Sequence, residues 1–308
     1  MLRAFFVRLS ENPSLRNFAE RSSLGRRVSG RFVAGTEIAD AVRATQAVNR
    51  AGMSVTIDNL GENVTNPDEA RHSAQLYHQI LDAIVANQLN ANISLKLTHM
   101  GLDVDEKLAR EIVSGLVAKA ASMNPPGFVR VDMEGSPYTQ RTLDFVHELH
   151  RMPGNANSVG TVIQAYLRRS ESDIEKLLAE GIRIRLCKGA YKESADIAFP
   201  AKSDVDANYV NLMKILLKSG TYHGLATHDE NIVQQAQAFA TSEKISRDSF
   251  EFQMLYGIRR DLQQRLVRDG WRVRIYIPFG TEWYPYFMRR LGERPANVLF
   301  IARNFFRS

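Results

Sequence analysis

Charged and amide side chains occur inside short, mostly β-branched runs, where burial is costly unless each group is paired or binds a ligand. Lys96, Asp132, Gln164 and Arg185 occupy such positions in NISLKL, FVRVDM, TVIQAYL and IRIRLC, and Tyr276 lies in VRIYIP. Any one of these residues could serve a structural ion pair. Their repetition in successive runs instead predicts one shared polar site.

The segment after IRIRLC is suited to binding an anion. Lys188 supplies a cation, and the small residues Gly189 and Ala190 leave backbone N–H groups accessible. Thr227 and His228, at the end of HGLATH, add further donors. A donor-rich wall of this kind fits a large dianionic cofactor such as FAD. The histidines and carboxylates do not form a spaced ligand set, so we expect no metal.

The last helical pattern, WYPYFMRRLGERPAN, carries Arg289 next to Arg290. Two adjacent guanidinium groups can clamp a carboxylate through bidentate hydrogen bonds. An isolated pair of arginines is more often an ordinary basic helix face. This helix, however, follows the last strand closely and is rich in aromatic residues, so its first half should overhang the site and exclude water. The pattern indicates a small amino or carboxylic acid held beside a cofactor.

Short apolar runs alternate with amphipathic stretches, which predicts parallel strands joined by helices. Strands are predicted at 53–58, 92–97, 128–133, 161–167, 182–187, 223–228, 250–255 and 273–278. Helices are predicted at 36–50, 68–87, 105–122, 138–149, 172–179, 207–217, 230–240, 259–268 and 284–291. Eight units favour a closed (β/α)8 TIM-like barrel, with the active site at the carboxyl ends of its strands. An open doubly wound sheet would usually carry GxGxxG after its first strand, and DNLGENVTN has a single glycine.

The domain prediction divides the chain in two. Residues 1–50 are interpreted as an Arg-rich segment of extra N-terminal helices, and residues 51–308 as the catalytic barrel. Cys187 is the only cysteine, so no intrachain disulfide can form. This composition favours a reducing compartment, and the expected location is the cytoplasm. We expect neither a signal peptide nor a membrane span, because no apolar run approaches about 18 residues.

The net charge of +6 is concentrated at the two ends of the chain, around an acidic middle. Solvated surface charge is the ordinary interpretation. Attraction to anionic lipid stays open. A non-catalytic basic module that docks on lipid or nucleic acid is therefore one alternative. No motif with interleaved aromatic and basic residues favours nucleic acid.

Eight motifs resemble the proline dehydrogenase family in order and spacing, over roughly residues 50–305. They are DNLGE, SLKLT, VRVDME, VIQAYL, RLCKGAY, LATHD, FEFQMLYG and YIPFGTEWYPYFMRRLGERPAN. The resemblance is to the single-function bacterial form. Cys187 departs from the aliphatic residue that is common at this position, and a buried Cys packs as a small hydrophobe, so we expect no consequence.

The resemblance implies FAD-dependent oxidation of L-proline to Δ1-pyrroline-5-carboxylate by hydride transfer to flavin N5, the first step of proline degradation to glutamate. It also implies that electrons pass to a membrane quinone. A peripheral contact with the inner, cytoplasmic membrane is compatible with this partner. No nucleic acid partner is expected.

The resemblance further implies individual roles. Arg289 and Arg290 hold the proline carboxylate, with Lys96 as a third cation. The predicted catalytic residues are Asp132, beside Lys96 and the substrate, and Arg185, near flavin N5. Further predicted roles are substrate binding by Leu255, Tyr276 and Glu293; gating by Glu62 as the partner of Arg289; and FAD binding by Met133, Gln164, Arg185, Lys188, Gly189, Ala190, Thr227 and His228.

Lysines at the strand ends leave a second class of enzyme open. Lys96 or Lys188 could be the Schiff-base nucleophile of a barrel lyase or aldolase. Lys96 could also accept a proton, on condition that burial among cations depresses its pKa.

Overall fold

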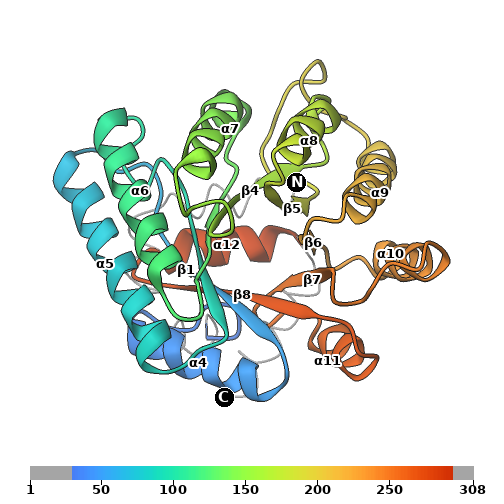
Figure 1. Cartoon of the computed structure of the whole chain (residues 1–308), viewed down its shortest axis with the longest axis horizontal. Helices are drawn as coiled ribbons and strands as arrows, with labels where there is room; N and C mark the ends of the chain where they lie inside the picture. The colour runs from blue at the N-terminus through green and yellow to red at the C-terminus, as the bar shows by residue number, and fades with distance from the viewer. Residues whose placement is uncertain (1–29, 294–308) are drawn as a thin grey trace.

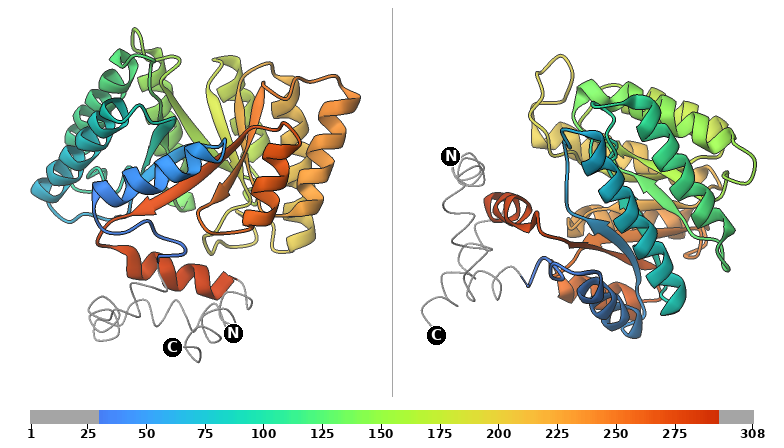
Figure 2. Two further views of the ribbon diagram at one scale, coloured as in Figure 1. Left: turned by 90° about the horizontal axis from the view of Figure 1, so that it is seen from below. Right: turned by 90° about the vertical axis from the view of Figure 1, so that its left-hand side faces the viewer.

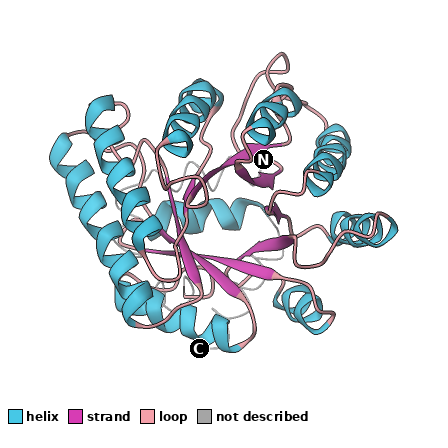
Figure 3. Cartoon of the chain, in the orientation of Figure 1, coloured by secondary structure: helices cyan, strands magenta, loops and turns pink. Residues whose placement is uncertain are grey.

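The computed structural model describes residues 30–293, with side chains described through residue 288. Eight parallel strands follow one another around a closed barrel, and the last strand pairs with the first. Figure 3 shows these strands inside an outer layer of helices. The predicted (β/α)8 barrel is confirmed.

Each predicted strand is present, and each is followed by a helix (Figure 1). The strands are β1 (Ser54–Asn59), β2 (Ala91–Leu95), β3 (Val129–Val131), β4 (Val159–Gln164), β5 (Arg183–Cys187), β6 (His223–Ala226), β7 (Phe250–Leu255) and β8 (Val273–Phe279). The helices are α4 (Ile38–Arg50), α5 (Pro67–Ala86), α6 (Glu106–Ser122), α7 (Ser136–Arg151), α8 (Ser170–Ala179), α9 (Lys202–Lys218), α10 (Glu230–Ser242), α11 (Arg260–Arg268) and α12 (Trp283–Glu293).

Polar residues cap the first helices of the ring. The Asn66 side chain accepts hydrogen bonds from the backbone N–H groups of Asp68 and Glu69, so α5 begins at Pro67. Asp105 caps α6 in the same way. Each such cap stabilises its helix by about 1 kcal/mol.

The barrel has an apolar shell around a polar interior. Successive side chains of a strand point to opposite faces, and Val55 and Ile57 of β1 are buried on the face that the helices cover. The alternate positions face inward, where the Arg185 guanidinium reaches Thr56 at 3.4 Å and Ser94 at 3.2 Å. The buried polar side chains are therefore held inside the barrel.

The first and last described helices take different places. α4 packs against β1, β8 and α5 and so belongs to the outer ring. α12 lies outside the ring, across one end of the barrel (Figure 2). Residues 1–29 of the predicted N-terminal segment lie outside the described part, and the proposed domain boundary after residue 50 stays a prediction.

The end of the barrel that α12 covers is the carboxyl end of the strands, because α12 begins soon after β8 ends. Trp283 and Phe287 pack against each other, with ring centroids 6.0 Å apart. Phe32, Leu60 and Ile258 belong to the same buried cluster. The predicted overhang of the last helix is confirmed.

Candidate active site

Predicted site residues from three strands meet at this end of the barrel. Arg185 Nη1 donates to Asp132 Oδ1 at 2.8 Å, and the Tyr276 hydroxyl donates to Asp132 Oδ2 at 2.9 Å. The Arg185 guanidinium also lies 5.1 Å from the centroid of the Tyr276 ring. The side chains of Arg185 and Asp132 are only 7% and 14% exposed, so solvent screens this ion pair weakly.

Lys96 brings a second positive charge to this cluster. Its side chain is partly buried, and within the described residues its ammonium has no hydrogen bond or ion pair at contact distance. Burial lowers the pKa of Lys96, but the carboxylates of Asp58, Asp132 and Glu62 together raise it above its ordinary value. The ammonium therefore stays protonated, and the condition under which Lys96 could accept a proton is not met.

Two residues that the sequence analysis missed hold the carboxylates of the cluster. The Ser94 hydroxyl donates to Asp132 Oδ1 at 2.7 Å. The Tyr77 hydroxyl, from α5, donates to the Ser94 carbonyl at 2.7 Å and lies 3.3 Å from Asp58 Oδ1. Ser94 could have been found, because it lies two residues before Lys96 and so shares its face of the strand. Nothing in the pattern of an amphipathic helix distinguishes Tyr77.

A series of hydrogen bonds inside the barrel fixes the orientation of Arg185. Arg185 Nε donates to Gln253 Oε1 at 2.5 Å, and Gln253 Nε2 donates to Glu251 Oε1 at 2.7 Å. Arg274 Nε donates to the same Glu251 oxygen at 2.6 Å. Gln253, itself fixed by Glu251, thus holds the Arg185 guanidinium in one orientation, as a preorganised charge requires.

The residues predicted to bind FAD form a wall at the ends of β3 to β6. Gln164 Nε2 donates to the Met133 carbonyl at 3.3 Å, whereas its buried Oε1 has no hydrogen-bond partner among the residues described. Thr227 is buried. His228 Nε2 accepts the backbone N–H of Leu255 at 2.9 Å. The wall therefore contains a buried acceptor that a ligand donor could satisfy.

The loop after β5 is held in one conformation. Lys188 Nζ contacts Asp206 Oδ1 at 2.5 Å and Asp229 Oδ2 at 2.9 Å. Gly189 has φ +106°, and a Cβ there would lie 2.2 Å from the Tyr166 ring. Only glycine fits both the backbone conformation and this close approach.

Glu193, also missed by the sequence analysis, ties this loop to the start of α7. It accepts hydrogen bonds from the Ser136 backbone N–H at 2.8 Å and from the Ser136 hydroxyl at 2.6 Å. The Tyr166 hydroxyl lies 3.5 Å from the same carboxylate. No sequence signal marks Glu193, because it lies in an ordinary charged loop.

The remaining predicted residues lie around the mouth. Glu62 is exposed in the loop after β1, close enough to Lys96 to raise its pKa. Leu255 ends β7 and packs against the aromatic cluster of α12. Ala190 is exposed beside Gly189. Three predicted substrate contacts belong to α12, but their side chains lie outside the described part: Arg289, Arg290 and Glu293.

Neither a metal site nor a membrane-spanning helix occurs in the described part of the chain. Residues 30–288, whose side chains are described, contain no group of three or more His, Cys, Asp or Glu side chains that could hold a metal ion. None of the described helices is long and apolar enough to cross a membrane.

Burial raises the pKa of the Cys187 thiol to about 12, so this group stays neutral.

The fold and the site define an enzyme of the (β/α)8-barrel class, with its charged residues gathered at the carboxyl ends of the strands. The model of the proline dehydrogenase family matches residues 41–303. The chain belongs to the proline dehydrogenase family and is thus an oxidoreductase.

Related proteins match nearly the whole chain. Proline dehydrogenase 1 of Bacillus subtilis (strain 168) is 41% identical over 304 residues, which is 98% of each chain. Proline dehydrogenase of Deinococcus radiodurans is 38% identical over 306 residues, covering 98% of this chain and 97% of its relative.

A solved structure shares the fold. Proline utilization A from Bdellovibrio bacteriovorus, inactivated by N-propargylglycine, superimposes with a TM-score of 0.80 and 25% identity. The match covers 87% of this chain and 32% of that chain, so the present chain spans about a third of its length.

Proposed function

We propose that the enzyme oxidises L-proline to Δ1-pyrroline-5-carboxylate with FAD and passes the electrons to a membrane quinone. Membership of the proline dehydrogenase family supports the substrate. The observation that carries the proposal is the meeting of Lys96, Arg185, Asp132 and Tyr276 in one largely buried cluster.

Lys96 is proposed to bind the substrate carboxylate together with Arg289 and Arg290. Its ammonium is protonated and still has donors to offer in the described part of the chain. Charge-assisted hydrogen bonds to a carboxylate are stronger when water is excluded. The aromatic residues Trp283 and Phe287 of α12 cover this end of the barrel and keep water away.

Orientation is the main contribution that we assign to the pocket walls. Tyr276 and Leu255 would pack against the pyrrolidine ring, and Asp132 keeps Tyr276 in place. Holding C5 of proline in one position can lower the barrier by about 7–11 kcal/mol. The proline amine has to be neutral when hydride leaves C5, and the protonated Lys96 disfavours a second positive charge beside it.

The residues present fit FAD. The unsatisfied Gln164 Oε1 offers an acceptor, Gly189 lets the loop backbone approach the Tyr166 ring closely, and Thr227 adds a donor. Met133, Lys188, Ala190 and His228 would complete the contacts. When bound, FAD would take up the hydride that leaves proline. Arg185 would favour the reduced cofactor through its positive charge.

The loop glycine gives a test of this cofactor wall. Gly189→Ala is expected to lower the flavin content of the purified protein, because the added Cβ would meet the Tyr166 ring. Gly220→Ala is the matched control, since Gly220 has φ +77° but open space around its Cβ position. Both variants share a backbone cost of about 1 kcal/mol. The flavin absorbance per mole of protein is the measurement, and equal flavin content in the two variants would contradict the assignment.

Arg289→Met and Arg290→Met are each expected to raise the KM for proline while FAD stays bound. Loss of a charge-assisted hydrogen bond of about 1.5–3 kcal/mol corresponds to roughly a 10- to 100-fold increase. Steady-state kinetics over a wide range of proline concentrations would measure the effect. An unchanged KM in either variant would remove that arginine from the carboxylate clamp.

The Schiff-base alternative has less support. A nucleophilic lysine must lose its proton, and the carboxylates around Lys96 raise its pKa. Lys188 is held between Asp206 and Asp229. Borohydride trapping with a carbonyl substrate separates the two functions, because only the lyase would form a covalent adduct.

Turnover tests the proposed reaction. The purified enzyme is expected to reduce a soluble quinone analogue when L-proline is added and to release Δ1-pyrroline-5-carboxylate in equal amount. Absence of that product would reject the proposal. A location in the cytoplasm, with peripheral contact with the cytoplasmic membrane through the basic ends of the chain, remains part of the proposal.

A further inference from the structure

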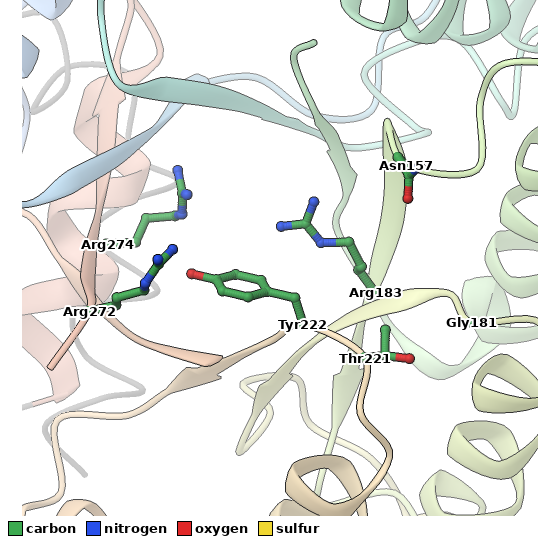
Figure 4. Close-up of a pocket in the computed structure, with 7 residues that line it drawn as sticks. All are labelled: Asn157, Gly181, Arg183, Thr221, Tyr222, Arg272 and Arg274. Atoms are coloured by element: carbon green, nitrogen blue, oxygen red, sulfur yellow. The ribbon is translucent and has the colours of Figure 1, made fainter. Parts of the chain in front are cut away.

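A second polar cavity lies at the opposite end of the barrel, where the strands begin. Its volume is about 560 Å³. It is lined by Arg183 at the start of β5, Arg274 in β8, and Arg272 and Tyr222 in the segments that lead into β8 and β6. Figure 4 shows the three guanidinium groups and the Tyr222 hydroxyl directed toward the same space. Arg274 also contacts Glu251 in the network that orients Arg185, whereas Arg183, Arg272 and Tyr222 have no part in the proposed oxidation of proline.

Arg183 is the unusual member of this group. Its guanidinium lies 4.3 Å from the centroid of the Phe128 ring and 4.9 Å from that of Tyr222, so two aromatic faces hold it. Its Nε is buried and has no hydrogen-bond partner in the described part of the chain. No ion pair of Arg183 with a carboxylate occurs among residues 30–288 either.

The charges around the cavity do not balance. Behind Arg183 lies Arg130, 3% exposed, whose Nη1 donates to the backbone carbonyls of Thr161 and Arg183 at 2.8 and 2.6 Å. Glu251 is the carboxylate near these arginines. Its oxygens already accept hydrogen bonds from Arg274 at 2.6 Å, from Gln253 at 2.7 Å and from Tyr222 at 2.9 Å. Positive charge therefore exceeds negative charge here.

The other titratable groups leave this excess in place. Burial, with the nearby Arg130 and Arg183, lowers the pKa of His223 to about 3, so His223 is neutral. Arg272, at the rim, pairs with Asp248 at 2.8 Å. Burial and the neighbouring Arg274 lower the pKa of Arg183, although Glu251 opposes this. The half-buried Arg183 guanidinium thus faces the cavity with no carboxylate paired to it in the described part of the chain, which favours an anion there.

The strands are shaped to admit these arginines. A Cβ on Gly160 of β4 would lie 2.3 Å from the Arg183 carbonyl oxygen and 2.9 Å from Arg130 Nη1. It would also lie 2.8 Å from the Phe128 ring. Because residue 160 is a glycine, the Arg130 and Phe128 side chains can pack next to Arg183. The packing of the barrel thus accommodates the arginines at this end.

We propose that this cavity binds a compact oxyanion, held by the Arg183 guanidinium with Arg272 and Arg274. Aromatic stacking alone would explain the position of Arg183 but would leave its hydrogen-bond donors unused. Planar guanidinium groups match the oxygens of phosphate and carboxylate groups. A volume of about 560 Å³ is ordinary for a small-molecule site, so the guanidinium lining of the cavity, and not its size, points to an anion.

Calorimetric titration of the full-length, FAD-loaded enzyme tests this site. Inorganic phosphate is the first probe and malonate the second, each at a constant ionic strength set with chloride. Saturable binding of one of the two supports the site and says which chemistry it prefers. The absence of saturable binding of both anions would overturn the proposal, whatever the variants do.

Three variants locate the binding. Arg183→Gln is expected to weaken the Kd about tenfold or more, because it removes the central charge. Arg272→Gln, at the exposed rim and already paired with Asp248, is expected to weaken it only about threefold, and it gives a second measurement should Arg183→Gln fail to fold. Arg71→Gln, an exposed arginine of α5 paired with Asp68, should leave the Kd unchanged. A Kd that is the same in the wild type and in the Arg183 and Arg272 variants that fold would also overturn the proposal.

Discussion

Arg185→Met is expected to lower kcat/KM for proline by about 10²–10³-fold, the effect typical of losing one preorganised electrostatic donor. Arg185 is 6% exposed and contacts Asp132, Gln253 and Ser94. Its loss would remove positive charge from the site and leave the Asp132 carboxylate without its ion-pair partner. The variant should therefore also show a lower flavin reduction potential than the wild type.

The control for Arg185 is an arginine of the outer ring. Arg169, at the N-cap of α8, pairs with the buried Asp173 at 2.6 Å, so Arg169→Met also leaves an aspartate without its partner. This variant should lose stability but keep the kinetic constants and the flavin potential. Steady-state kinetics and redox titration of both variants make the comparison. A wild-type kcat/KM in Arg185→Met would show that Arg185 is structural.

Lys96→Met is expected to raise the KM for proline by roughly 10- to 100-fold, because it removes a charge-assisted contact with the carboxylate. The carboxylates of Asp58, Asp132 and Glu62 keep Lys96 protonated. The pKa of Asp58 is already raised by burial, with Lys96 opposing the shift. Without Lys96 the Asp58 pKa should rise further, so the acidic limb of the pH profile that reports Asp58 ionisation should move to higher pH.

Two further variants separate charge from shape at this position. Lys96→Arg retains a cation and should recover part of the lost KM effect. Lys119→Met on α6 removes a lysine that pairs with Asp82 on the outer ring, and it should leave KM unchanged. Proline kinetics as a function of pH would measure all three variants. A normal KM in Lys96→Met would exclude Lys96 from substrate binding.

The strands could be predicted because each is a short, mostly apolar run in which successive side chains face opposite sides of the sheet. The residues at which the strands end could not be predicted. β3 ends at Val131, although the run VRVDM continues through Met133. β4 ends at Gln164, where the chain turns and the Leu167 N–H bonds back to the Gln164 carbonyl. Local composition contains no sign of where a strand loses its neighbour. The predicted strands were therefore right in number and order and too long in places.

Helix starts show the same limit. α9 begins at Lys202, five residues before the predicted start, because its first turn is polar and carries little of the apolar stripe. α7 begins at Ser136, where Glu193 from a distant loop accepts the Ser136 N–H. A cap supplied from another part of the chain leaves no local signal.

The charged centre of the site could be predicted because the strands place it. Lys96, Asp132 and Arg185 are polar residues in apolar runs, and parallel strands bring the ends of such runs together. The supporting contacts of Tyr77 and Glu193 could not be predicted, because they depend on how a helix and a loop pack against that centre. The basic cavity at the opposite end escaped for a different reason. Arg183 and Arg274 lie at the start of their strands, where no chemistry was expected.

The absorption spectrum of the purified protein, recorded before and after anaerobic addition of L-proline, tests the central claim most directly. We expect a yellow protein with a flavin spectrum that bleaches when proline is added and stays unchanged when D-alanine is added instead. A colourless protein that takes up no FAD, or a flavin spectrum that proline leaves unchanged, would contradict it.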